Sequence, residues 1–309
     1  MKVLAAATDL PAGSRPVCAA IGVFDGVHLG HQQVLRQTLS DAARHRAVTV
    51  AVTFDRHPNA IVAPASVPPL IYPLSKKLEV LAAFGLEAAC VIRFDKPFSQ
   101  IPGGQFIRSL ARDFRQIETI CVGDTFLFGW KRSGNVALLR QLGAELRFQV
   151  HALPDVTWDG QPVSSTRIRE AVRAGDFDAA ARMLGRPYSL RGPVIQGGRF
   201  GRKLGFPTAN LDVTGIVVPP SGVYVAEAQV GANRWRAAVN IGHRPTVSSA
   251  APPLQVEAHL LDFDRDIYGQ ELELTFLKKL RDEQKFPSAA ALRAQIAQDA
   301  AQARDFTTA

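Results

Sequence analysis

The feature that most constrains the fold is a strand followed at once by a glycine-containing turn and a helix. The apolar run 17–21 is typical of a buried strand. Residues 22–31 read GVFDGVHLGH, and the apolar residues after them recur every three to four positions, as in a helix. We therefore predict that Asp25 caps this helix and that His28 and His31 share one face of its first turn.

This turn has the composition of a phosphate site. A helix N-terminus carries free N–H groups and partial positive charge, both of which favour a bound phosphate. Gly26 and Gly30 let a ligand approach the backbone, and the imidazoles of His28 and His31 can neutralise charge on a polyphosphate. A lone histidine near a helix start is more often a cap or a surface residue, so the hypothesis depends on the pair.

Strand-like and helix-like patterns alternate through the first half of the chain. This alternation predicts a parallel α/β sheet with helices on both faces, and ligands bind beyond the carboxyl ends of such strands. Gly85 and Gly143 are expected to end two of the helices. Further strands are expected at 47–54, 88–94, 118–123 and 145–153, and further helices at 75–84, 104–112 and 136–142.

A second phosphate-binding candidate closes this half. Ser164, Ser165 and Thr166 precede a helix that carries Arg169 in its first turns. Hydroxyls and a guanidinium at a helix N-terminus can hold phosphate groups. An ordinary helix cap with solvated arginines is the alternative interpretation.

After residue 184 short strands separated by Gly, Pro or Asn turns replace the alternating pattern. This texture predicts a small closed antiparallel β-barrel with a C-terminal helix at 289–303. Two domains, 1–184 and 185–309, also agree with the length of 309 residues. The strands are expected at 189–195, 223–230, 235–241, 254–261 and 271–277.

The barrel half has its own glycine-rich, basic segment, residues 197–210 (GGRFGRKLGFPTAN). Gly198, Arg199 and Lys203 belong to a cationic loop suited to wrapping phosphates, unless it is a hairpin with solvated arginines. Thr208 and Asn210, if extended, point to one face and offer oxygen ligands to Mg²⁺.

Glu257 is the candidate general base of the barrel. Along the strand 254–261, Glu257 and His259 point opposite to the apolar residues between them. A lone Glu on such a face is usually solvated, and the catalytic interpretation comes from its place in the sequence Val-Glu-Ala-His.

These segments together resemble a known family. GVFDGVHLGH resembles the nucleotide-binding signature of the nucleotidylyltransferases, in its flavin adenylyltransferase form, and 164–169 (SSTRIR) is similar to a second element of that group. LGFPTAN (204–210) resembles the riboflavin kinase signature, and SGVY, VNIG with RPT, VEAH and DIYG follow it in order. The chain therefore resembles the bacterial bifunctional riboflavin kinase/FAD synthetase family.

The resemblance implies two reactions. In the barrel, Mg²⁺ and ATP would phosphorylate riboflavin to FMN, with Thr208 and Asn210 holding metal and phosphates and Glu257 as base. In the α/β half, FMN would attack a second ATP to give FAD and pyrophosphate. The ATP site there would comprise Phe24, Asp25, Gly26, His28, His31, Ser164, Ser165, Thr166 and Arg169.

Three alternatives remain open. A kinase with a degenerate first half is suggested by Thr125 and Asn135, which depart from the family pattern. An RNA-binding or tRNA-charging protein would suit the net charge of +8, although no basic strand interleaved with aromatic residues supports it. A flavin-sensing regulator without turnover is disfavoured by Glu257.

Composition indicates the compartment and the partners. Cys18, Cys90 and Cys121 lie in apolar runs and are expected to be buried free thiols in a reducing compartment. No apolar run approaches the about 20 residues that span a bilayer. We therefore expect a cytoplasmic protein that uses riboflavin, FMN and ATP and binds no nucleic acid or membrane. Weak self-association is compatible with the sequence, which leaves the oligomeric state open.

Overall fold

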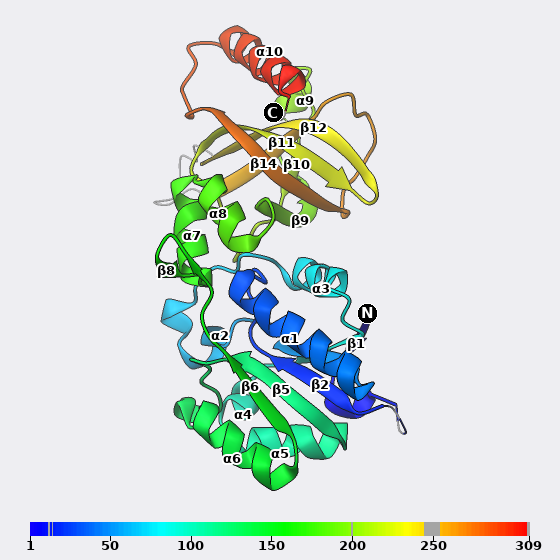
Figure 1. Cartoon of the computed structure of the whole chain (residues 1–309). Helices are drawn as coiled ribbons and strands as arrows, with labels where there is room; N and C mark the ends of the chain where they lie inside the picture. Colours follow the sequence, from blue (N-terminus) through cyan, green and yellow to red (C-terminus); the bar gives the residue numbers. More distant parts are fainter. Residues whose placement is uncertain (12, 14, 199, 244–253, 308–309) are drawn as a thin grey trace. The chain divides into compact units, whose positions relative to one another are not determined.

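The structure is a computed structural model that describes residues 1–309 except 12, 14, 199, 244–253 and 308–309 (Figure 1). Contacts between residues divide the chain into two compact units, 1–165 and 166–309. The expected domain boundary at 184–185 stays a prediction.

The first unit is built on a parallel six-stranded sheet of order β1-β4-β3-β2-β5-β6 (Figure 1). From β2 the chain adds strands on one side and then on the other, so the sheet has a switch point at β2 and β5, where such sheets bind ligands. The strands are β1 (Lys2–Leu4), β2 (Val17–Ile21), β3 (Val48–Phe54), β4 (Ala88–Ile92), β5 (Ile117–Gly123) and β6 (Gln149–Leu153).

Helices cover both faces of this sheet, as predicted. Ala20 on β2 packs with Leu35 and Leu81 in the core on one face, while Ile107 and Leu139 belong to the core on the other. Alternate residues of each strand thus feed the two cores. The helices are α1 (Leu29–His45) and α3 (Leu74–Ala83) on the first face, and α5 (Gly103–Phe114) and α6 (Val136–Leu146) on the second.

Short elements complete the first unit. Asp159 and Gly160 have φ values of 54° and 70° and form the turn of a hairpin, which the Asp-Gly pair signals in the sequence although no prediction was made there. The short elements are α2 (Asn59–Val62), α4 (Lys96–Ser99), 3₁₀ turns at Ala7–Asp9, Pro64–Ser66 and Trp130–Arg132, and the strands β7 (Thr157–Trp158) and β8 (Gln161–Pro162).

The predicted end of α6 at Gly143 was wrong. The helix continues to Leu146 and ends at Arg147, which has a left-handed conformation, so Glu145 is helical and β6 begins only at Gln149. Gly143 serves another purpose, because a Cβ there would lie 2.7 Å from the Phe148 carbonyl oxygen as the chain turns back. Gly143 is thus required by close packing inside the helix, and in the sequence it was mistaken for the residue that ends the helix.

The second unit contains a closed antiparallel barrel of order β10-β13-β12-β11-β14-β9, which confirms the predicted architecture (Figure 1). The glycine-rich segment was expected to be a loop, but it contains the short helix α9, and the strand β10 was not predicted. The elements are α7 (Ser165–Ala174), α8 (Phe177–Leu184), β9 (Ser189–Ile195), α9 (Phe200–Lys203), β10 (Ala209–Leu211), β11 (Gly222–Val230), β12 (Asn233–His243), β13 (Leu254–Leu260), β14 (Glu271–Arg281) and α10 (Ala289–Asp305).

Two sets of contacts hold the helices of this unit to the barrel. Phe177 of α8 stacks on Phe276 of β14, with ring centroids 5.2 Å apart and planes 11° apart. Arg281 of β14 forms a fork with Asp299 of α10, in which the Nη2–Oδ2 distance is 2.7 Å. Asp299 is buried, so this ion pair is shielded from solvent and fixes α10 in register.

The core of the first unit yields a stability prediction. Leu139→Ala should lower the free energy of unfolding by about 2–5 kcal/mol, because Leu139 is fully buried and the neighbours cannot fill the cavity. Thermal unfolding followed by circular dichroism would measure the loss. Arg140→Ala on the same helix is the control, since Arg140 is exposed, and equal effects of the two substitutions would contradict the core assignment.

Candidate active sites

The first candidate site is the turn between β2 and α1. Three of its residues, Phe24, Gly26 and Val27, have left-handed φ values of 53°, 79° and 43°. This conformation is rare for a β-branched residue such as Val27. It carries the chain round so that the helix begins after His28.

Two histidine rings lie at this helix start. The Nδ1 atom of His28 accepts from the backbone N–H of His31 at 3.5 Å, and the two rings stack with centroids 3.7 Å apart. His28 is therefore the cap, and the prediction that Asp25 caps the helix was wrong. Because the left-handed turn intervenes, the Oδ1 atom of Asp25 instead accepts from the backbone N–H of Ile71 at 2.9 Å.

The serine segment joins this turn in part. Ser165 Oγ donates to the backbone carbonyl of Asp25 at 3.0 Å, so the structure brings together the histidine turn and one end of the serine segment. Thr166 and Arg169 lie on α7 and belong to the second unit by their contacts, and Arg169 is buried. The predicted part of these two residues in the site therefore stays a prediction.

Sequence reasoning missed Lys77, a buried lysine beside the turn. Its Nζ donates to the carbonyls of Val23 and Phe54 at 3.2 and 2.9 Å and contacts Thr53 Oγ1 at 3.1 Å. Burial lowers the pKa of Lys77 to about 8, although the charges of Asp25 and Asp55 act in the opposite direction. Its position on the apolar face of α3, three and four residues before Val80 and Leu81, could have signalled it.

A second acidic group follows β3. Burial works to raise the pKa of Asp55, but hydrogen bonds from Arg56 and from the Phe94 backbone outweigh it and hold the pKa below its usual value. Asp55 is thus an anion that ties the end of β3 to the segment after β4. Lys77 and Asp55 thus lie at the carboxyl ends of the parallel strands, where sheets of this topology bind ligands.

The second candidate site is set by the register of the barrel. Glu257 on β13 pairs with Asn210 on β10 and with Asn240 on β12. Paired residues of antiparallel strands point to the same face, so the three polar side chains form one row. Val256 and Ala258 are buried on the opposite face. The structure thus places Asn210 and Glu257 side by side, as the sequence hypothesis required.

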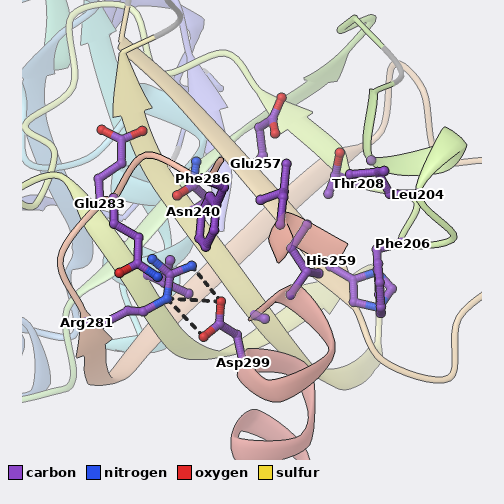
Figure 2. A pocket seen from close by; sticks show the side chains of 16 residues that line it. Leu204, Phe206, Thr208, Asn240, Glu257, His259, Arg281, Glu283, Phe286 and Asp299 are labelled. Atoms are coloured by element: carbon purple, nitrogen blue, oxygen red, sulfur yellow. Dashed lines mark hydrogen bonds and ion pairs between the residues drawn. The ribbon is translucent and has the colours of Figure 1, made fainter. Parts of the chain in front are cut away.

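Two pockets share Thr208 but lie on different faces of β13, because Glu257 and His259 line the first whereas Ala258 and Leu260 line the second. The first has a volume of about 290 Å³, and Figure 2 shows Glu257 on its wall between Asn240 and Thr208. The second has a volume of about 430 Å³. Glu257 lines only the first pocket, whereas Thr208 lines both. Among their lining residues are Phe206, Thr208, Glu257, His259, Phe286 and Ile296 for the first, and Arg202, Thr208, Phe263, Arg265, Ile267 and Tyr268 for the second.

The two pockets differ in chemistry. Aromatic and aliphatic side chains, among them Phe286 and Ile296, cover much of the first, which suits a flat organic substrate. Arg202 and Arg265 line the second together with Asp264 and Asp266, so its lining is polar and charged, and the two guanidinium groups are donors for phosphate oxygens. Arg265 lies over the rings of Trp235 and Phe263, at 5.0 and 5.3 Å from their centroids.

The residues predicted to hold phosphates and metal in the barrel lie in the glycine-rich segment 197–210. Asn210 is buried, and a Cβ on Gly197 would lie 2.3 Å from its Nδ2 atom, so the glycine leaves room for the amide. Gly198 follows in the same segment and Lys203 ends α9, while Arg199 lies outside the described residues. The described residues contain no cluster of three or more His, Cys, Asp or Glu side chains suited to a metal.

Comparison with known proteins defines the class. The family model described as FAD synthetase matches residues 11–167, and the model described as riboflavin kinase matches residues 184–307. The chain therefore joins a FAD synthetase domain to a riboflavin kinase domain. Both models match, which favours the bifunctional interpretation over a kinase with a degenerate first half.

Relatives agree over nearly the whole chain. A bifunctional riboflavin kinase/FMN adenylyltransferase of Escherichia coli (strain K12) is 36% identical over 309 residues, covering 99% of this chain and 98% of that protein. The protein of the same description from Pseudomonas fluorescens is 36% identical over 290 residues, covering 94% and 93%. The chain belongs to the bifunctional riboflavin kinase/FMN adenylyltransferase family.

A solved structure shares the complete fold. A crystal structure described as a macrolide-efflux protein from Streptococcus pneumoniae superposes with a TM-score of 0.82 at 27% identity and covers 99% of both chains. None of the helices in the described part of this chain has the length and apolar character needed to cross a membrane.

Proposed function

We propose that this chain catalyses the two reactions for which its relatives are named. ATP phosphorylates riboflavin to FMN in the barrel, and a second ATP transfers its adenylyl group to FMN in the α/β unit, giving FAD and pyrophosphate. The observation that carries the proposal is the position of Glu257 on the wall of the first pocket, paired with Asn210 in the barrel register and close to Thr208, which lines both pockets.

In the barrel, the first pocket takes riboflavin and the second takes ATP, with its triphosphate directed to Thr208. Glu257 accepts the proton of the primary hydroxyl while that oxygen attacks the γ-phosphorus and the bond to ADP breaks. The hydroxyl of Thr208 and the buried amide of Asn210 are oxygen donors that fit Mg²⁺, as proposed from the sequence. Bound Mg²⁺ would neutralise phosphate charge there.

In the α/β unit, the nucleophile is already an anion. An oxygen of the FMN phosphate attacks the α-phosphorus of ATP and pyrophosphate leaves, so the protein only positions the reactants and stabilises charge. His28, His31 and the amides at the start of α1 supply that stabilisation, together with Ser164, Ser165, Thr166 and Arg169. Phe24, Asp25 and Gly26 shape the turn.

The remaining assignments belong to the same proposal. Residues 1–184 form the FMN adenylyltransferase domain and residues 185–309 the riboflavin kinase domain. The chain works in the cytoplasm on small molecules, without nucleic acid or membrane. The three cysteines support a reducing compartment, because all are free and buried.

The assignment of the two reactions to separate sites predicts that one substitution stops FAD synthesis and another stops FMN formation. His28→Asn should stop the reaction at FMN, because asparagine keeps a helix cap but lacks the imidazole. Asn210→Ala should stop FMN formation and spare FAD synthesis from supplied FMN. Both products are followed by chromatography after incubation with riboflavin, ATP and Mg²⁺. If each variant lost both steps, the assignment of the two reactions to separate sites would be wrong.

Glu257→Gln tests the proposed base. The rate constant kcat for riboflavin phosphorylation should fall about 10²–10⁴-fold, because glutamine cannot accept the proton. The KM for riboflavin should change little, since the side chain keeps its shape, and FAD synthesis from FMN should be unchanged. Steady-state kinetics with each substrate measures these values, and a kcat near that of the unmodified chain would remove Glu257 as the base.

Gly197→Ala tests the room around Asn210. The added Cβ would overlap the Asn210 amide, so the amide must move and the KM for ATP in riboflavin phosphorylation should rise about tenfold or more. Gly104→Ala is the matched control, because nothing lies within 4 Å of a Cβ at that helix position. Unchanged kinetics in the Gly197 variant would show that Asn210 does not act from its present position.

A further inference from the structure

The turn that carries the two histidines is held from outside. Phe24 and Val27 are left-handed, a conformation that residues other than glycine keep only where the surroundings impose it. The carbonyl of Val23, which enters the turn, accepts from Thr53 Oγ1 at 3.0 Å and from Lys77 Nζ at 3.2 Å. The backbone just before the strained residues is therefore fixed by side chains of β3 and α3.

Lys77 joins the ends of two neighbouring strands. Its ammonium group has three N–H donors and three acceptors within reach: the carbonyls of Val23 and Phe54 and the hydroxyl of Thr53. The carbonyls belong to the segment that follows β2 and to the last residue of β3, at the carboxyl ends of two neighbouring strands. Only 8% of the residue is exposed, so these bonds form in a largely dry environment.

We propose that Lys77 is a positioning residue for adenylyl transfer, which as an ammonium holds the end of β2 against the end of β3 and so fixes the histidine turn. The proposal rests on the proposed function of the α/β unit. A neutral amine has two N–H donors and a lone pair, so it would lose one bond and repel the third acceptor. The turn would then shift, and misplacement by about 1 Å can cost about 10² in rate.

Other charged or titratable groups face Lys77. Asp25 and Asp55 act on it electrostatically and favour its charge. Together with Arg56, His57 and Tyr72 they line the same small recess. With a pKa of about 8, Lys77 loses its proton within an accessible pH range.

The pH dependence of the free energy of unfolding distinguishes a positioning role of Lys77 from a purely structural one. The pKa of Lys77 is lower in the folded chain than its ordinary value of 10.5, so between about pH 8 and 10.5 the unfolded chain binds more protons at this site. Lys77 therefore makes the fold more stable as the pH rises through this range. A loss of adenylyl transfer above pH 8 through Lys77 cannot come from unfolding.

The test uses the full chain and measures kcat for FAD synthesis from FMN between pH 6.5 and 9.5. In the unmodified chain, kcat for FAD synthesis should fall as the pH rises, with an apparent pKa of about 8; this fall is called the alkaline limb below. The kcat for riboflavin phosphorylation should show no such fall near pH 8. Lys77→Met should lower kcat for FAD synthesis about 10²-fold at pH 7 and remove the limb, leaving riboflavin phosphorylation intact. Its stability relative to the unmodified chain should fall as the pH rises above 8.

Two control variants lie on the same helix. Lys76→Met makes the same change at a residue paired with Glu79, and should keep both the rate and the alkaline limb. Val80→Ala removes buried apolar surface without changing a charge, so it should destabilise the unit and keep the limb.

Each outcome decides between the interpretations. An unmodified chain that makes FAD without an alkaline limb near pH 8, or a Lys77→Met variant within threefold of its kcat, would overturn the proposal. A Lys77→Met loss that matches Val80→Ala at equal destabilisation would do the same. An unmodified chain that makes no FAD at any pH would instead refute the proposed function of the α/β unit.

Discussion

The left-handed turn after β2 is the constraint on which the first site depends. Left-handed conformations at Phe24 and Val27 cost of order 1–3 kcal/mol each, so other contacts must maintain them. Gln32 Nε2 donates to the Val27 carbonyl at 3.0 Å, and Asp25 is bonded through both its side chain and its carbonyl. The strain is thus offset within the folded chain, and the stacked imidazoles at the helix start are held in place for the charge stabilisation proposed for them.

The second site depends on register instead of strain. A shift of one residue along β13 would turn Glu257 to the face of Val256 and bring an apolar side chain to the first pocket. Closure prevents this, because β13 is paired on both sides, with Asn210 and Asn240 opposite the same glutamate. The barrel therefore specifies the position of one carboxylate through hydrogen bonds made by many backbone groups.

Sequence patterns predicted the architecture of both units, because repeated local preferences for helix, strand and turn determine it. Alternating strands and helices indicated the parallel sheet, and short strands between turns indicated the barrel, both confirmed by the structure. Asp25 was misjudged because a cap depends on dihedral angles at Gly26 and Val27 that composition does not reveal. Strand β10 was missed because three residues carry no periodicity, and Lys77 because its partners are backbone carbonyls distant in sequence. The Asn210–Glu257 pair needed the barrel register to bring the two residues together.

The different side chains of the two proposed sites follow from their nucleophiles. Riboflavin presents a hydroxyl that must lose a proton as it attacks, so the barrel provides a carboxylate, Glu257, facing the acceptor pocket. The FMN phosphate is already ionised, and a carboxylate beside it would repel it; the turn presents His28 and His31 at a helix N-terminus instead. Asp25 is compatible with such a site because its side-chain oxygen is engaged by the Ile71 amide. A cation at Lys77 close to Asp25 further offsets that negative charge, which would favour the phosphates of ATP and FMN at the proposed site.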